Sequence, residues 1–325
     1  MKHNLTTMKT MLVGMTTVWC SYSFAQQHPN VLWYDKPAQY WEEALPLGNG
    51  RIGAMVYGNP SNEEIQLNEE TISAGSPYKN YNPDAKKDLP AILNLIFEGK
   101  YPEAQAMAET HILSKNGFGM PYQTADSLHI DFPGHERFTD FRRELDVDKA
   151  VATTYTVAGV QYKREIFTSF TDQLVIVRLT ASQPRKLTFS THMTCPQEVE
   201  NKTVGKNMIE GVTKGDKNIP AALRFRTEMK LTLQGGKATA NNDTPLSVQN
   251  ATTATFYITM ATNFVNYKDI SGDPVARNKA YLKNAGKNYA KALQTHIHAY
   301  EKYYKMVYGM ESLLMGTAAR WQSCL

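Results

Sequence analysis

The sequence lacks the features that mark the common metal-binding and nucleotide-dependent classes. Its 325 residues contain only three cysteines, too few and too far apart for a disulfide framework or a zinc site: Cys20, Cys195 and Cys324. It contains no Walker loop, no dinucleotide fingerprint and no nucleophile elbow. The histidines show no metal-ligand spacing. We therefore expect no bound metal and no cofactor.

Charge and hydropathy exclude two further classes. The 35 basic and 31 acidic residues leave a net charge of +4, which gives no electrostatic footprint for nucleic acid. No segment approaches the roughly 20 apolar residues that a membrane span needs. With 42% hydrophobic residues, the chain can bury one or two cores. The composition predicts an ordinary globular protein.

Residues 1–25 form a segment of a different kind. Two lysines precede a mostly apolar run that ends at Cys20, and the small residues Ser23 and Ala25 follow. This order is typical of a secretory signal peptide. We expect cleavage after Ala25 and export to the periplasm or the extracellular space. Lipidation at Cys20 is the less favoured alternative.

The remaining sequence is dominated by the patterns of β-strands. Leu174–Leu179 and Thr252–Ala261 are rich in β-branched and aromatic residues, which is typical of buried strands. From 128 to 262, strands recur without helices between them, which indicates antiparallel pairing. The predicted fold is a mainly β, antiparallel β-sandwich over residues 26–272.

Two segments change to a helical period. Apolar residues at helical spacing predict a small helical insertion at 83–113 on the outside of the sandwich, with Gly99 as the break between two helices. An apolar stripe from Tyr281 to Tyr304 predicts one linker helix over residues 273–307.

Five blocks of sequence carry a resemblance to a known family. They are Trp33–Ala38 with Trp41–Met55, Ile65–Thr71, Leu128–Phe132, Arg143–Asp146 and Ala261–Asp269. In this order they resemble the N-terminal portion of glycoside hydrolase family 95, the α-L-fucosidases. The resemblance implies a super-β-sandwich that packs on its own catalytic α/α barrel. It also implies a fucosylated oligosaccharide or glycan as substrate, hydrolysed with inversion, although some members prefer α-L-galactosides.

The resemblance ends near Met306, and residues 308–325 do not continue it. We expect this chain to lack the catalytic barrel and to be inactive alone, with a frameshift or early stop favoured over a dedicated short protein. The alternatives are a stand-alone carbohydrate-binding β-sandwich module and a fragment that folds poorly. No catalytic residue is assigned.

Candidate substrate-binding residues lie in two of the blocks. The resemblance implies that Asn68, Glu69 and Thr71 form a loop whose polar groups contact sugar hydroxyls; ordinary solvated groups at a turn are the alternative. Asn49 and Arg51 form a second candidate, because glycines beside Asn49 allow a close backbone approach. For this pair a tight hairpin turn with Arg51 paired on the surface is the favoured interpretation.

Three aromatic residues near the start of the first predicted strands are a further candidate. Trp33, Tyr34 and Trp41 have rings that can stack on sugar faces. Because such residues more often fill the core or an interdomain seam, we expect them to pack in the core.

Overall fold

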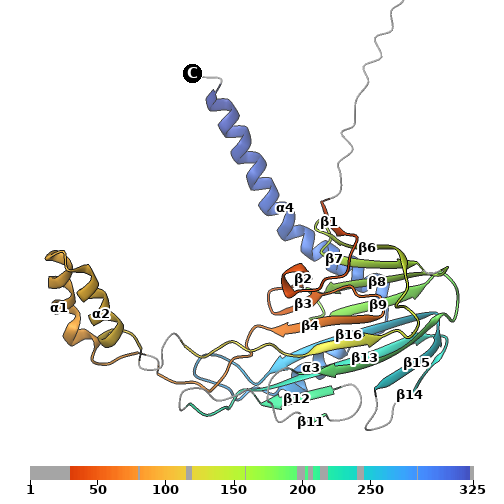
Figure 1. Ribbon diagram of the computed structural model, residues 1–325, viewed down its shortest axis with the longest axis horizontal. Coiled ribbons are helices and arrows are strands. Elements are labelled where there is room, and N and C mark those ends of the chain that lie inside the picture. The colour runs from red at the N-terminus through yellow and green to blue at the C-terminus, as the bar shows by residue number, and fades with distance from the viewer. Residues whose placement is uncertain are drawn as a thin grey trace, which may run out of the picture.

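The structure is a computed structural model that describes residues 30–79, 81–114, 119–157, 159–195, 202–203, 208–212, 219–239, 245–283 and 285–322. The predicted signal peptide, residues 1–25, lies outside the described residues. Two sheets with antiparallel strand pairs lie face to face and form the body of the molecule (Figure 1). The predicted antiparallel β-sandwich is confirmed.

The larger sheet has nine strands in the order β1-β6-β7-β8-β9-β16-β13-β12-β11. Their bounds are β1 (Val31–Tyr34), β6 (Thr139–Asp146), β7 (Val151–Val157), β8 (Gln161–Thr168), β9 (Val175–Ala181), β11 (Lys202–Thr203), β12 (Met208–Val212), β13 (Arg224–Gln234) and β16 (Thr253–Thr262). The smaller sheet has seven strands in the order β14-β15-β10-β5-β4-β3-β2. Their bounds are β2 (Leu45–Gly48), β3 (Ile52–Val56), β4 (Asn62–Glu69), β5 (Ser127–Asp131), β10 (Leu187–Thr194), β14 (Lys237–Thr239) and β15 (Leu246–Ala251).

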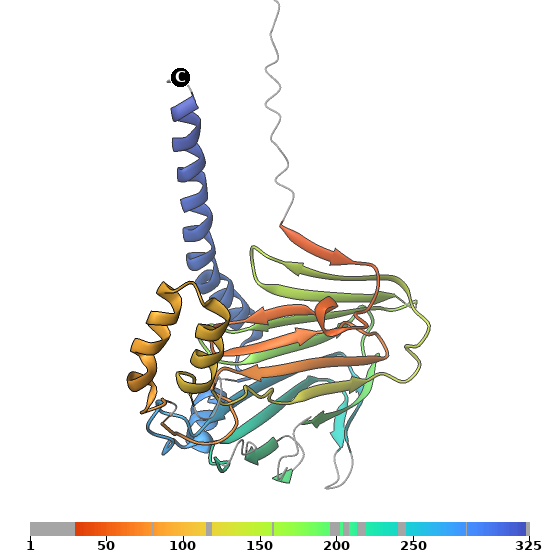
Figure 2. The ribbon, with the colours of Figure 1, turned by 60° about the vertical axis from the view of Figure 1, so that its left-hand side comes forward.

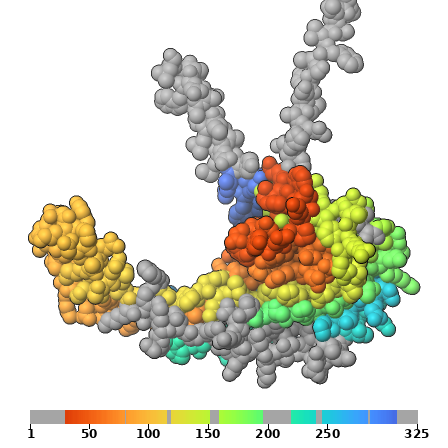
Figure 3. Space-filling model, in the orientation of Figure 1, coloured from red at the N-terminus to blue at the C-terminus, as the bar shows by residue number. Residues whose placement is uncertain are grey.

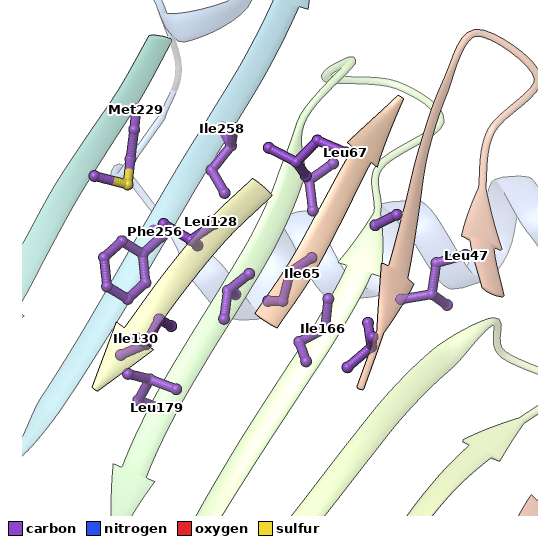
Figure 4. Close-up of a cluster of buried hydrophobic side chains, with 14 of the residues drawn as sticks. Leu47, Ile65, Leu67, Leu128, Ile130, Ile166, Leu179, Met229, Phe256 and Ile258 are labelled. Carbon is purple, nitrogen blue, oxygen red and sulfur yellow. The ribbon is translucent and has the colours of Figure 1, made fainter. Parts of the chain in front are cut away.

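One apolar core fills the space between the two sheets. In β4, buried and partly exposed residues alternate, so that Ile65 and Leu67 point inward. They meet Ile166 and Ile258 of the nine-stranded sheet within one cluster of buried side chains (Figure 4). Burying an aliphatic side chain of this size stabilises a fold by about 1.5–3 kcal/mol. The alternation in the sequence therefore also sets which face of each strand is turned inward.

Strand β16 is buried along its whole length rather than on one face. Its outer face is covered by helix α3 (Pro274–Leu282) and the start of helix α4 (Tyr289–Gln322). Tyr281 and Ala285 pack there against Tyr257. A strand covered on both sides has no polar face, which explains its continuous run of apolar residues and threonines.

The prediction of one helix over 273–307 is wrong, because the chain turns between α3 and α4. Gly286 adopts a φ of +84°, and a Cβ there would lie 2.8 Å from the Thr232 side chain. Lys230 Nζ donates to the carbonyl oxygen of Ala285 at 2.8 Å. The turn keeps the first half of the apolar stripe on the sheet, while Tyr303 and Met306 remain exposed.

The insertion predicted at 83–113 consists of helices α1 (Ala85–Phe97) and α2 (Tyr101–His111). Gly99, with a φ of +76°, forms the break between them. The hairpin projects away from the sandwich on loops (Figure 1), and Figure 2 shows its two helices side by side. It leaves large apolar side chains exposed, among them Leu89, Leu93 and Phe97.

The prediction that the early aromatic residues pack in the core is also wrong. Trp33 and Trp41 are 57% and 56% exposed. Trp33 lies in β1, the outermost strand of its sheet, and Trp41 begins a short 3-10 helix, η1 (Trp41–Glu43). The guanidinium groups of Arg142 and Arg143 lie over the rings of Trp33 and Tyr34, at 5.0 and 4.3 Å. Among the described residues, no helix combines the length and apolar character of a membrane span.

Candidate functional site

The five predicted site residues lie at one end of the seven-stranded sheet. Asn49 and Arg51 belong to the turn between β2 and β3, and Asn68, Glu69 and Thr71 belong to the end of β4 or follow it. Strands β3 and β4 are neighbours, and Gly53 pairs with Asn68. The fold therefore brings two separate sequence blocks together.

Asn49 shapes the β2–β3 turn. Its Oδ1 accepts hydrogen bonds from the backbone N–H groups of Arg51 and Ile52, at 3.0 and 2.9 Å, while Gly50 takes a φ of +91°. Its Nδ2 donates to the carbonyl oxygen of Ser169 at 2.9 Å, next to the nine-stranded sheet. Asn49 is thus both a turn residue and a link between the two sheets.

Arg51 extends this link across the sandwich. Its Nε donates to Oε1 of Gln173 at 2.7 Å, and its Nη1 donates to the carbonyl oxygen of Met260 at 2.7 Å. The same Nη1 lies 3.3 Å from Oε1 of Glu69. The guanidinium also lies over the Tyr281 ring of α3, at 4.7 Å. Arg51 therefore pairs in a half-buried cluster and not on the open surface.

Glu69 is almost completely buried, with 3% of its surface exposed. Its Oε2 accepts hydrogen bonds from the backbone N–H and the hydroxyl of Thr71, at 2.8 and 2.6 Å. The Thr71 hydroxyl also contacts the hydroxyl of Thr262 in β16. Burial raises the pKa of Glu69, and the bonds from Thr71 and the charge of Arg51 oppose that rise. We call Asn49, Arg51, Glu69, Thr71 and Thr262 the cross-sheet cluster.

Asn68 and Glu70 are placed differently from Glu69. The Oδ1 atom of Asn68 is buried and has no hydrogen-bond partner among the described residues. The side chain of Glu70 is exposed, and its backbone N–H donates to the carbonyl oxygen of Arg51 at 2.9 Å. Of these neighbouring polar groups, the Glu70 carboxylate is the one that faces solvent. Sugar binding by the five predicted residues stays a prediction.

The contacts of the cross-sheet cluster indicate a structural role, in which it links the two sheets, rather than a catalytic one. Removing one partner of a buried, hydrogen-bonded ion pair destabilises a fold by several kcal/mol, because the other charge is left buried and uncompensated. Among the described residues, no group of three or more His, Cys, Asp or Glu side chains is placed to hold a metal ion. The cluster is therefore a structural junction at which the two sheets and helix α3 meet.

Beside this cluster lies a feature that the sequence-based predictions missed. A pocket of 330 Å³ is lined by residues 73–78 after β4 and by Phe264 and Tyr267 after β16. Both segments adjoin or belong to blocks that the sequence had marked, Ile65–Thr71 and Ala261–Asp269. The aromatic residues of the second block were the signal that could have found it.

Comparison with known proteins identifies the family. The sequence profile of the glycosyl hydrolase family 65 N-terminal domain matches residues 32–267. The chain belongs to this family. The predicted N-terminal domain of a glycoside hydrolase is therefore confirmed at this level, over most of the sandwich.

Three curated relatives carry fucosidase names. Alpha-L-fucosidase 2 of Arabidopsis thaliana is 38% identical over 168 residues, which are 50% of this chain and 19% of the relative. Probable alpha-fucosidase A of Aspergillus niger is 26% identical over 309 residues, 90% of this chain and 37% of the relative. Probable alpha-fucosidase A of Aspergillus oryzae is 24% identical over 248 residues, which are 72% of this chain and 34% of the relative. The chain thus spans about a fifth to rather more than a third of these relatives.

One solved structure is also similar in part. It is a protein of the human microbiome provisionally assigned as a kojibiose phosphorylase, with 12% identity and a TM-score of 0.47. The likeness covers 85% of this chain and 38% of that protein. A likeness of this strength carries no argument about function.

Proposed function

We propose that this chain is the N-terminal domain of a glycoside hydrolase of the family 95 type, which removes terminal α-L-fucose from oligosaccharides or glycans. The observation that carries the proposal is the 26% identity with a probable alpha-fucosidase along 90% of this chain, together with 38% identity to a second fucosidase. Within the enzyme, the domain supports the catalytic part rather than performing the hydrolysis.

The chemistry of glycoside cleavage supports this division of labour. Hydrolysis needs one carboxyl group to protonate the leaving oxygen and a second as base or nucleophile, about 5–9.5 Å apart on opposite sides of the sugar. In the cross-sheet cluster, Glu69 is buried and bonded to Thr71 and Arg51, so that it is not available to a glycosidic oxygen. We assign the acid and base to the remainder of the enzyme.

Two exposed apolar surfaces support packing against that remainder. One is the α1–α2 hairpin with Leu89, Leu93 and Phe97, and the other is the exposed side of α4 with Tyr303 and Met306. The hairpin stands apart from the sandwich (Figures 1 and 3), and α4 extends from another part of it (Figure 1). Large apolar side chains in solvent are typical of surfaces that a partner covers. We propose the α/α barrel of the full enzyme as that partner.

A domain exchange tests the proposal. Residues 32–267 replace the matching region of the Aspergillus niger relative, and hydrolysis of an aryl α-L-fucoside and of 2′-fucosyllactose is measured. We expect the chimera to hydrolyse both, with little activity on the corresponding α-L-galactoside. The matched control deletes the same region. A chimera that is no more active than the deletion contradicts the proposal.

The chain alone gives a second measurement. We expect the purified chain to turn over neither substrate, because a single sugar-contacting loop would bind ground and transition states about equally and so would not accelerate the reaction. Turnover that is lost in Glu69→Ala or Glu70→Ala would contradict this and assign catalysis to the sandwich.

Export is part of the proposed function. The signal-like segment before Gln26 leads us to propose that the enzyme acts on glycans outside the cytoplasm. Expression in a Gram-negative host should yield a periplasmic protein that begins at Gln26. N-terminal sequencing checks this, and an intact Met1 would contradict it.

A further inference from the structure

We propose that the 330 Å³ pocket beside the cross-sheet cluster is a sugar-binding subsite for one 6-deoxyhexose ring. Its volume lies near the lower end of the roughly 300–1,000 Å³ of small-molecule sites, which suits a single ring. The choice of a 6-deoxy sugar rests on the proposed function, whereas the choice of a neutral ring rests on the lining alone.

Four segments of the chain line the pocket and are tied to one another: residues 73–78, Met120, Leu223 and residues 264–270. The backbone N–H of Ala74 donates to the carbonyl oxygen of Pro121 at 2.8 Å, and that of Ala222 donates to the carbonyl oxygen of Gly75 at 3.0 Å. Gly75 adopts a φ of +75°, and a Cβ there would lie 2.7 Å from Sδ of Met120. The positive φ favours glycine at position 75, and a Cβ there would require the Met120 side chain to shift.

The loop after β16 is fixed by two polar side chains. Asn263 is 2% exposed; its Oδ1 accepts from the Arg224 backbone N–H at 2.8 Å and its Nδ2 donates to the Ala222 carbonyl oxygen at 3.2 Å. Arg277 Nη1 donates to the carbonyl oxygens of Thr262 and Phe264, both at 2.7 Å. These bonds hold the loop in place without a ligand, which reduces the entropy lost on binding.

The lining combines aromatic rings, apolar groups and a few hydroxyls. Tyr267 is 74% exposed; Lys268 Nζ lies over one face of its ring, 5.0 Å from the centroid, and the other face can serve as a platform for a pyranose. Leu223 and Met120 provide apolar wall, and Ser73 and Ser76 bring hydroxyl groups. None of the described residues that line the pocket carries a charged side chain. This composition suits a neutral polyhydroxylated ring.

The apolar wall also favours a sugar with a methyl group at C6 over one with a hydroxymethyl group there. L-Fucose and L-galactose differ only by the hydroxyl at this carbon. Against Leu223 and Met120 that hydroxyl would lose its water without gaining a partner, which is unfavourable. The methyl group of L-fucose would instead be buried against apolar atoms.

Saturation-transfer NMR and titration of the purified chain test the inference. The probes are the methyl α-glycosides of L-fucose, L-galactose and D-glucose. We expect the strongest saturation at the C6 methyl protons of the fucoside, and an affinity for the galactoside lower by about tenfold, the loss that one unpaired buried hydroxyl brings. Tyr267→Ala should weaken fucoside binding by up to about tenfold, as the loss of a stacked ring does.

The matched control is Tyr101→Ala, because Tyr101 is 66% exposed on α2 and lies outside the pocket. Its affinity for the fucoside should equal that of the wild-type chain. Absence of saturation for all three sugars, equal affinity for the three, or binding unchanged by Tyr267→Ala would overturn the inference. Since Tyr267 is exposed, circular dichroism should show both variants folded.

The outcome is independent of the test of the proposed function. An active chimera together with a chain that binds no sugar would overturn this inference alone. A chain that binds the fucoside through Tyr267, together with a chimera that is no more active than the deletion, would overturn the proposed function alone.

Discussion

Two carboxylates, Glu69 and Asp126, are both buried, yet their surroundings differ. Glu69 ends β4 and accepts bonds from the backbone and hydroxyl of Thr71, with Arg51 beside it. Asp126 precedes β5, and its carbonyl oxygen accepts from the backbone N–H of Leu67. The Oδ2 atom of Asp126 accepts from the Thr227 hydroxyl, whereas Oδ1 has no hydrogen-bond partner among the described residues.

Glu69 has partners that compensate for its burial, whereas the burial of Asp126 is compensated less and therefore costs stability when its carboxyl is ionised. Burial raises the pKa of both carboxyls and brings that of Asp126 to about 6, although the Thr227 hydroxyl and Cys195 oppose the rise. Arg51 gives Glu69 a compensating charge, and Asp126 has none among the causes of its shift. A polar residue at a strand end is thus no sign of a ligand site until its partners are known.

Removing Glu69 should produce the largest effect. Glu69→Ala leaves Arg51 half-buried without its carboxylate and opens a cavity at the junction of two sheets and a helix. We expect a loss of about 3 kcal/mol in the free energy of unfolding, the lower end of the range for breaking a buried pair from one side. Chemical denaturation measures it. Glu70→Ala, at the exposed neighbour, should change stability by less than about 0.5 kcal/mol; equal losses in the two variants would contradict the role assigned to Glu69.

Asp126 should make stability depend on pH in the opposite sense to a salt-bridged carboxylate. Because its pKa is higher in the folded state than in the unfolded state, its contribution is fully present below about pH 4 and is lost as pH rises through about 6. Between pH 4 and pH 7 this amounts to roughly 3 kcal/mol, as an order of magnitude.

The measurement compares the wild-type chain with Asp126→Asn, which cannot ionise. The difference in unfolding free energy between the two should change in favour of the variant as pH rises from 4 to 7. Other titrating groups are common to both proteins and cancel in the difference. A difference that stays constant over this range would show that Asp126 does not carry the shifted pKa.

The strands could be predicted from the sequence because each one's neighbours in space impose a local pattern. Half-buried β4 alternates, and β16, covered by α3 and α4, does not. The break at Gly286 was missed because the apolar stripe keeps helical spacing on both sides of it. The exposure of Trp33 was missed because a sequence does not say which strand lies at the edge of a sheet.

The site was predictable in its residues and not in their partners. The turn at Asn49 follows from local Asn-Gly chemistry and was expected. The bonds from Arg51 to Gln173 and Met260 join positions 122 and 209 residues apart, which only the strand order of the two sheets determines. The pocket at Tyr267 likewise needs four separate segments of the chain to meet in one place.

The smallest expected effect comes from removing one of the hydrogen bonds that Glu69 accepts, so that its carboxylate, like that of Asp126, has fewer partners. Thr71→Val keeps the shape of the side chain and the backbone N–H, but removes the hydroxyl that bonds Oε2 of Glu69 and contacts Thr262. We expect a loss of about 1 kcal/mol at pH 7, the net worth of one hydrogen bond. Because the hydroxyl stabilises the ionised carboxylate, its removal raises the pKa of Glu69 further, and the loss should shrink as pH falls and the carboxyl becomes protonated.

Thr262→Val is the matched control, since it leaves the bond between Thr71 and Glu69 in place and should show a weaker dependence on pH. If both variants lose the same stability with the same pH profile, the Thr71 hydroxyl supports the packing of β16 and not the charge of Glu69.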